Sequence, residues 1–163
     1  SVPYDLSAGT RHLDRGVAGR FYTRYFLRSL KGKIRAKEAL LRPLLDLDTV
    51  YGARTLRAFD DAATAVLHGF RDAEEYYRES SSGGFLGGVA VPTLLLHALN
   101  DPFLPPEAVP SGAMGANPAL TPLLTRTGGH VGFRSAASRS GGPFWAEAEV
   151  AAFLAHHLRG RAP

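Results

Sequence analysis

The stretch VPTLLLHALNDPF, residues 91–103, decides the fold class of this 163-residue chain. Its apolar run is short, and the turn residues Asn100, Asp101 and Pro102 follow it directly. A short apolar run that ends in turn chemistry is typical of a fully buried strand in a parallel sheet. Asp101 therefore comes just after the carboxyl end of a predicted strand, where open α/β sheets place their functional residues.

A second strand and loop follow the same plan. Residues 120–124 form another apolar run, and the loop TGGHVGF at 127–133 carries His130. We expect strands at 91–99 and 120–124 to be parallel neighbours, with Asp101 and His130 at the same edge of the sheet. An acid after one strand and a histidine after the next match the last two members of a Ser–Asp–His triad in α/β-hydrolase order.

The serine of such a triad has no motif in this sequence. No G-x-S-x-G occurs, although that motif forms the nucleophile elbow. Ser80, Ser81 and Ser82 precede Asp101, which is the permitted order, but they follow a predicted helix, whereas an elbow needs a strand-to-helix turn. We therefore expect the nucleophile and the oxyanion hole to precede Ser1 in a longer chain.

The composition narrows the classes of function. The chain is 45% hydrophobic and 21% charged, which is globular composition, and it has no cysteine for disulfides or thiolate zinc sites. The net charge of the chain is +4, and its basic residues are densest at 20–37. A basic helix surface of this kind is more typical of solvated surface than of a nucleic-acid groove. No metal-ligand cluster or phosphate-binding glycine loop appears, so no cofactor and no metal are predicted.

Membrane and targeting signals are also missing from the sequence. No apolar run approaches the roughly 20 residues of a membrane-spanning helix. The first residues, SVPYD, lack the basic and apolar regions of a signal peptide. We expect a cytoplasmic protein without a transmembrane segment, and the composition leaves room for a peripheral contact with lipid.

A helical block precedes the central strand. We expect residues 1–6 to be the end of a strand with its exit loop. Residues 10–85 are expected to form a helical lid or cap, and residues 89–163 the C-terminal strands that carry the acid Asp101 and the base His130. The helical spacing of Val17, Phe21 and Tyr25 predicts a long first helix. Helix caps are expected at Thr55, at Asp72, and at either Asp46 or Asp48. Loops are expected at 80–88 and 105–118, and a last helix at 143–158.

Several motifs resemble the YheT-like branch of the α/β-hydrolases, in the order of that family. They cover nearly the whole chain and comprise RYF at 24–26, RTLRAFDD at 54–61, VPTL at 91–94, DPF at 101–103 and GGHVGF at 128–133. The resemblance implies an α/β class fold, of which this chain is the C-terminal part. It implies hydrolysis of carboxylic esters with short to medium acyl chains, a small-molecule substrate.

The resemblance also implies roles for individual residues. Asp101 would be the acid and His130 the general base, while Phe21, Tyr25 and Phe103 would contact the acyl substrate. For Phe21 and Tyr25, ordinary packing in a helical core is an equally good interpretation.

Other polar residues receive structural interpretations. Asp5 is a rival for the acid, because it also follows a predicted strand end. Asp60 and Asp61 are neighbours on a helix and do not face each other, so capping or pairing is favoured over an acid–base role. His97 is expected to be a core residue with satisfied hydrogen bonds. His156 and His157 suit the negative end of the last helix and lack ligand partners.

Two alternative functions stay open. The chain could be a non-catalytic interaction module that uses its aromatic, basic helical block, although such a module has no evident use for Asp101 or the GGHVGF motif. It could also keep the fold and use a different nucleophile, such as an aspartate.

Overall fold

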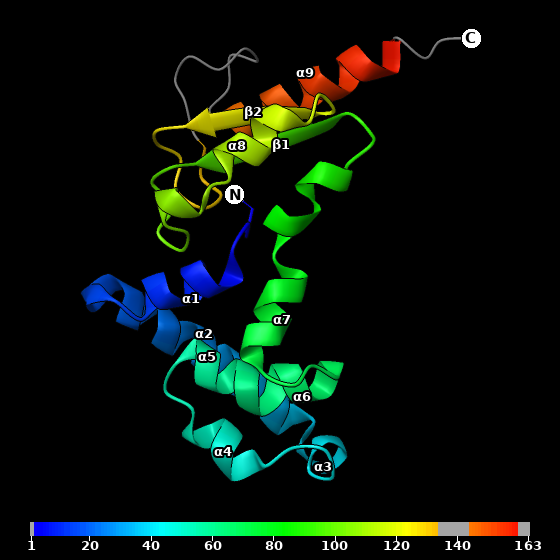
Figure 1. The fold of residues 1–163 in the computed structure, drawn as a ribbon. Coiled ribbons are helices and arrows are strands. Elements are labelled where there is room, and N and C mark those ends of the chain that lie inside the picture. The colour runs from blue at the N-terminus through cyan, green and yellow to red at the C-terminus, as the bar shows by residue number, and fades with distance from the viewer. Residues whose placement is uncertain (1, 134–143, 160–163) are drawn as a thin grey trace. The chain divides into compact units, whose positions relative to one another are not determined.

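A computed structural model describes residues 2–133 and 144–159, and the chain divides into two compact units. The sheet unit comprises Ser1–Tyr4 and Ser82–Pro163, and the helical unit comprises Asp5–Ser81 (Figure 1). Each unit has its own cluster of buried apolar side chains. Every helix in the described ranges is too short or too polar to cross a lipid bilayer.

The sheet consists of two parallel strands in the described part of the chain. Strand β1, Thr93–Ala98, pairs with β2, Leu120–Thr125, so that Thr93 lies opposite Leu120 and Ala98 opposite Thr125. The predicted parallel pairing is therefore confirmed, although β1 starts two residues later than expected. Pro92 precedes it and has no N–H to donate to a ladder.

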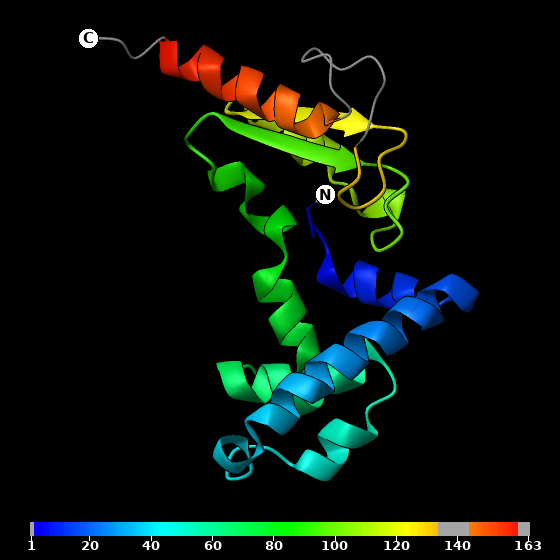
Figure 2. The ribbon, with the colours of Figure 1, turned by 180° about the vertical axis from the view of Figure 1, so that it is seen from behind.

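Helices cover both faces of this sheet. Helix α8, Ser111–Ala116, lies on one face and α9, Trp145–Arg159, runs along the other (Figures 1 and 2). The 3₁₀ turns η2, Ser82–Gly88, and η3, Pro106–Ala108, lie in the connections before and after β1. The core of this unit combines Tyr4, Leu86, Leu95, Met114 and Leu120.

The prediction that the first strand is fully buried is wrong. Leu95 and His97 are buried, but Leu94 and Leu96 are half-buried and Val91 is 61% exposed. Alternate strand residues point to opposite faces, and Leu95 packs with Met114 of α8. Leu94 and Leu96 therefore belong to the face of α9, a helix that has no fully buried residue and covers its face only in part.

Two further expectations need correction. Residues 2–6 contain no strand, because the Asp5 carboxylate accepts a hydrogen bond from Ala8 N at 2.8 Å and starts helix α1, Leu6–Leu13. Residues 105–118, expected to be a loop, contain α8, which is anchored by the 2% exposed side chain of Met114.

The helical unit begins with α1 and the long helix α2, Gly16–Ala36. It continues with α3, Glu38–Leu41; α4, Leu47–Gly52; α5, Leu56–Phe59; the π-turn η1, Asp60–Thr64; α6, Ala65–His68; and α7, Ala73–Ser80. The predicted caps Thr55 and Asp72 each accept a backbone N–H of the helix that follows. Of the two alternatives Asp46 and Asp48, Asp46 is the cap, and Asp48 lies within α4. The core comprises Leu27, Ile34, Leu41, Leu45, Leu47, Val50, Ala53, Phe59 and Ala63.

Helix α2 packs on the core through a different side from the one its aromatic residues suggest. Thr23, Leu27 and Ile34 are buried, whereas Phe21 is 67% and Tyr25 64% exposed. The alternative that Phe21 and Tyr25 are ordinary core residues of this helical unit is therefore wrong.

A partly buried polar network centres on the π-turn. The Asp60 carboxylate accepts hydrogen bonds from the hydroxyls of Tyr77 at 2.7 Å and Thr64 at 2.6 Å, and Asp61 accepts from Ala73 N at 2.7 Å. Burial raises the pKa of Asp60, and the two hydroxyl hydrogen bonds oppose that shift. The structural interpretation of Asp60 and Asp61 is confirmed, since both carboxylates hold neighbouring segments together.

Removing the Tyr77 hydroxyl should destabilise the helical unit. Tyr77→Phe leaves the half-buried Asp60 carboxylate with one donor fewer, and we expect a loss of about 1.5–3 kcal/mol, the usual value for a hydrogen bond to a charged group. Urea unfolding followed by far-ultraviolet circular dichroism measures it. The neighbouring Tyr76→Phe is the matched control, and equal stability of the two variants would contradict the assignment.

Candidate active site

Asp101 and His130 meet at the carboxyl edge of the two-stranded sheet. His130 Nδ1 lies 2.8 Å from Asp101 Oδ2, although 29 residues separate them in the sequence. The Asp101 side chain is completely buried, whereas 38% of the His130 side chain is exposed. The expectation that both lie at one sheet edge is confirmed, and the histidine is the member of the pair that solvent can contact.

The turn after β1 orients the Asp101 carboxylate. Its second oxygen, Oδ1, accepts a hydrogen bond from Phe103 N at 2.8 Å, and Asp101 N donates to Ala98 O at 3.1 Å. A carboxylate that accepts from the backbone two residues later is usual Asx-turn chemistry. Here that turn also directs Oδ2 toward the histidine.

The loop after β2 is bent by two glycines so that His130 faces Asp101. Gly129 has φ +63°, a left-handed conformation that other residues adopt at a cost. Its N–H donates to Asn100 Oδ1 at 3.0 Å. A Cβ on Gly128 would lie 2.7 Å from the Phe133 ring, so this position has no room for a larger residue.

Asn100 is a site residue that sequence reasoning missed. It was interpreted only as part of a turn, yet its side chain ties the loop after β1 to the loop after β2. Asn100 directly precedes Asp101, and the carboxyl ends of neighbouring parallel strands lie together. This position in the sequence is the signal that could have identified Asn100 as a residue of the site.

The geometry defines how the imidazole can act. An ionised carboxylate only accepts hydrogen bonds, so Nδ1 of His130 is the donor to Asp101 and, in the neutral ring, Nε2 carries the lone pair. A histidine held in this tautomer by a buried carboxylate can take up a proton at Nε2, and the resulting imidazolium is stabilised by the same carboxylate.

The predicted substrate-contacting residues are divided between the units. The ring of Phe103 lies 4.7 Å from the imidazole of His130, measured between ring centroids. Phe21 and Tyr25 lie on α2 in the helical unit, with most of their side chains exposed. Only Phe103 is therefore brought to the Asp101–His130 pair within one unit, and acyl binding by all three stays a prediction.

His97 differs from its expected role. It is completely buried, and its Nδ1 accepts a hydrogen bond from Val2 N at 3.4 Å. Its Nε2 has no hydrogen-bond partner among the described residues, nor does the buried hydroxyl of Tyr4, whose ring lies 5.4 Å away. The expectation of a fully satisfied core histidine is therefore wrong. Burial lowers the pKa of His97, and the nearby Asp101 carboxylate opposes that shift.

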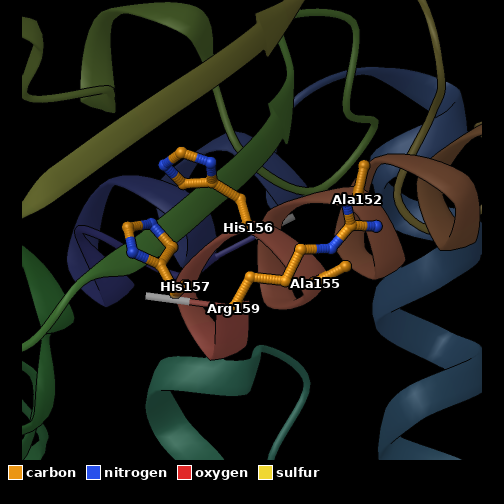
Figure 3. A pocket seen from close by; sticks show the side chains of 5 residues that line it. All are labelled: Ala152, Ala155, His156, His157 and Arg159. Atoms are coloured by element: carbon orange, nitrogen blue, oxygen red, sulfur yellow. The ribbon is translucent and has the colours of Figure 1, made fainter. Parts of the chain in front are cut away.

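A separate shallow pocket lies on the last turns of α9, lined by Ala152, Ala155, His156, His157 and Arg159 (Figure 3). The imidazoles of His156 and His157 lie beside each other edge to face, 4.9 Å between centroids. The ring of His157 also packs on Phe153 at 4.5 Å. Within residues 2–133 and 144–159, no group of three or more histidines and carboxylates is arranged to hold a metal ion.

Three known proteins with similar sequences are named as lipid- or ester-cleaving enzymes. The chain is 38% identical over 135 residues to YheT of Escherichia coli (strain K12), a candidate esterase, and 32% identical over 133 residues to the mouse phospholipase ABHD3. It is 33% identical over 153 residues to a monoacylglycerol lipase of Saccharomyces cerevisiae. The matched regions cover 82%, 82% and 90% of this chain.

The chain spans about a third to two-fifths of the length of these relatives, namely 39%, 32% and 33% in the same order. No protein-family model matches the chain. No solved structure matches it either.

The buried His97 should make the stability of the sheet unit depend on pH. Its pKa is lowered in the folded state, so the unfolded chain takes up a proton there first as the pH falls below about 6.5. The contribution is therefore fully present above about pH 6.5 and is lost as the pH falls toward the folded pKa.

The fluorescence of Trp145, the single tryptophan, reports this unit in urea titrations. Between about pH 7 and pH 5.5, we expect the free energy of unfolding to fall less in His97→Asn than in the wild type. His68→Asn, which changes an exposed histidine of the helical unit, is the control. Identical slopes for wild type and His97→Asn would contradict the burial argument.

Gly128→Ala should disturb the His130 loop. The new methyl would overlap the Phe133 ring and lie 3.1 Å from Ala98 Cβ, and overpacking of this kind costs about 1–3 kcal/mol. Thermal unfolding followed by Trp145 fluorescence measures the loss. Gly115→Ala, where a methyl meets no atom within 4 Å, is the matched control and should not lose stability. Equal melting temperatures would show that the loop adapts.

Proposed function

Because this chain belongs to the α/β-hydrolase family, we propose that it forms the C-terminal part of a serine hydrolase that cleaves carboxylic acyl esters. The observation that carries the proposal is the 2.8 Å contact between His130 Nδ1 and the buried Asp101 carboxylate. The names of the relatives, which include an esterase, a phospholipase and a lipase, support the same chemistry.

In the proposed reaction, His130 is the general base and Asp101 the residue that positions it. Nε2 of His130 removes the proton of a serine hydroxyl as the serine oxygen attacks the ester carbonyl. The imidazolium then gives that proton to the leaving alcohol, and an acyl-serine remains. In the second half, Nε2 takes a proton from water as the water oxygen attacks the acyl carbon. The imidazolium then returns that proton to the serine oxygen as the acyl–serine bond breaks and the carboxylic acid leaves. Asp101 stays ionised throughout and stabilises the imidazolium.

The serine comes from outside this chain in our proposal. The sequence contains no G-x-S-x-G, and Ser81, the central residue of the serine run, is engaged at the end of α7. Its hydroxyl donates to Tyr77 O at 2.5 Å and accepts from Leu6 N at 3.0 Å. A hydroxyl committed to two backbone groups does not suit a nucleophile.

The remaining assignments belong to the same proposal. The helical unit acts as a lid, Phe103 contacts the substrate beside His130, and Phe21 and Tyr25 present an apolar surface to acyl chains or lipid. The proximity of the Phe103 ring to the imidazole supports the first of these contacts. The exposure of Phe21 and Tyr25 leaves them available for the second.

The proposal has a direct test in the coding sequence and in the enzyme it encodes. We expect a G-x-S-x-G motif upstream of Ser1, and esterase activity of the longer protein toward p-nitrophenyl butyrate. His130→Ala should lower kcat on the order of a million-fold and Asp101→Asn on the order of ten-thousand-fold, because triad members act as a unit.

Matched controls remove the same residue types elsewhere. His157→Ala changes a half-buried histidine of α9, and Asp48→Asn changes an exposed carboxylate of the helical unit. Both variants should leave kcat unchanged. If the upstream elbow carries an aspartate in place of the serine, the nucleophile is an aspartate and the proposed serine hydrolase reaction is wrong. Full activity of His130→Ala would remove the proposed base.

A further inference from the structure

Helix α2 carries an unusual charge for its length. Its 21 residues include the cations Arg20, Arg24, Arg28, Lys31, Lys33 and Arg35 and no carboxylate at all. Two of these cations have partners within the unit. Lys31 Nζ donates to Tyr51 O at 2.8 Å and to Ala53 O at 2.5 Å, and the Arg35 guanidinium lies 5.1 Å from the centre of the Tyr51 ring.

Three arginines form an exposed row that is not neutralised. Arg20, Arg24 and Arg28 are spaced four residues apart, are exposed, and make no ion pair with a described carboxylate. With Arg54 they line a groove of about 760 Å³ between α2 and the segment before α5. Of the described residues that line this groove, Asp14 is the single acidic one, against five cations, so the lining is strongly positive.

An exposed apolar row lies next to the arginines. Val17, Phe21 and Tyr25 are also four residues apart, and their side chains are 78%, 67% and 64% exposed. Phe21 and Tyr25 directly follow Arg20 and Arg24 in the sequence. Successive residues of an α-helix are separated by about 100°, so the apolar row lies beside the arginine row on the helix surface. One surface of α2 therefore presents a row of exposed apolar side chains with a row of guanidinium groups along one side of it.

We propose that this surface of α2, defined by Val17, Phe21, Tyr25, Arg20, Arg24 and Arg28, docks on an anionic phospholipid surface. A basic helix with an aromatic side is the pattern of helices that lie in the interface of a membrane. The aromatic rings enter the boundary between headgroups and acyl chains, and the guanidinium groups bind lipid phosphates in a bidentate manner. Charge complementarity selects an anionic lipid surface over a neutral one.

This inference goes beyond ester hydrolysis, because docking needs neither the nucleophile nor His130. It names the lipid surface that would bring a membrane-derived ester to the enzyme. The two proposals can fail separately. If the chain does not bind vesicles, the proposed ester hydrolysis can still be correct. If the longer protein does not hydrolyse esters, the chain can still bind vesicles.

The test is co-sedimentation of the chain with vesicles of phosphatidylcholine alone or with about a third of phosphatidylglycerol. We expect binding to the anionic vesicles, weakened by high salt, and much weaker binding to the neutral ones. Arg20→Gln/Arg24→Gln/Arg28→Gln should weaken binding on the order of a hundred-fold, from about fivefold per cation. Phe21→Ser/Tyr25→Ser should weaken binding to both kinds of vesicle.

A control variant with the same loss of charge distinguishes an effect of the arginine row on vesicle binding from an effect of net charge. Arg15→Gln/Lys33→Gln/Lys37→Gln also removes three exposed cations, but from other sides of α2 and its ends, and should retain most of the binding. Circular dichroism confirms that each variant keeps its helices. Equal losses in the two triple variants would reduce the effect to net charge and overturn the proposal.

Two other occupants of this surface are outcomes of the same experiments. Binding to duplex nucleic acid without binding to vesicles would assign the arginine row to a different partner and overturn the proposal. Self-association in sedimentation velocity that Phe21→Ser/Tyr25→Ser abolishes would show that a second copy of the chain covers the apolar row, and would overturn it as well.

Discussion

The parallel pairing of β1 with β2 is the constraint on which the rest of the sheet unit depends. It sets the ends of the two strands, Ala98 and Thr125, side by side, so the loops that follow them begin at the same edge. Asp101 and His130 can therefore meet at 2.8 Å across 29 residues of sequence. An antiparallel pairing would have sent the two loops to opposite edges. The side chain of Asn100 then joins the loops directly, through Gly129 N.

Buried polar groups are treated differently in the two units. In the helical unit, Asp60 is surrounded by donors, and its cost of burial is offset by two hydroxyl hydrogen bonds. In the sheet unit, Asp101 is paired on both oxygens, but His97 Nε2 and the Tyr4 hydroxyl have no partner among the described residues. Unpaired buried groups cost stability. His97 is a residue of β1, the strand that precedes the Asp101 turn, and the Tyr4 ring lies 5.4 Å from it, so both unpaired groups belong to the unit that holds the candidate site.

Helix α2 carries two rows of exposed side chains, one apolar and one of arginines. The helix uses Thr23, Leu27 and Ile34 to pack on its unit, which leaves its aromatic row and its arginine row outside. This exposed apolar row beside the arginines is the observation on which the proposed docking surface rests. The same helix thus combines a structural side, which explains why it forms, with a surface that packing within its unit does not require.

The sequence by itself determined the two strands, their parallel order, the caps at Thr55 and Asp72, and the meeting of Asp101 with His130. These features follow from local patterns, namely apolar runs, turn residues and side chains that accept their own helix's N–H groups. Only the tertiary structure decided which side of α2 is buried and that His97 Nε2 has no hydrogen-bond partner among the described residues. Each of these depends on which distant segment packs against the residue, and hydrophobic periodicity does not contain that information.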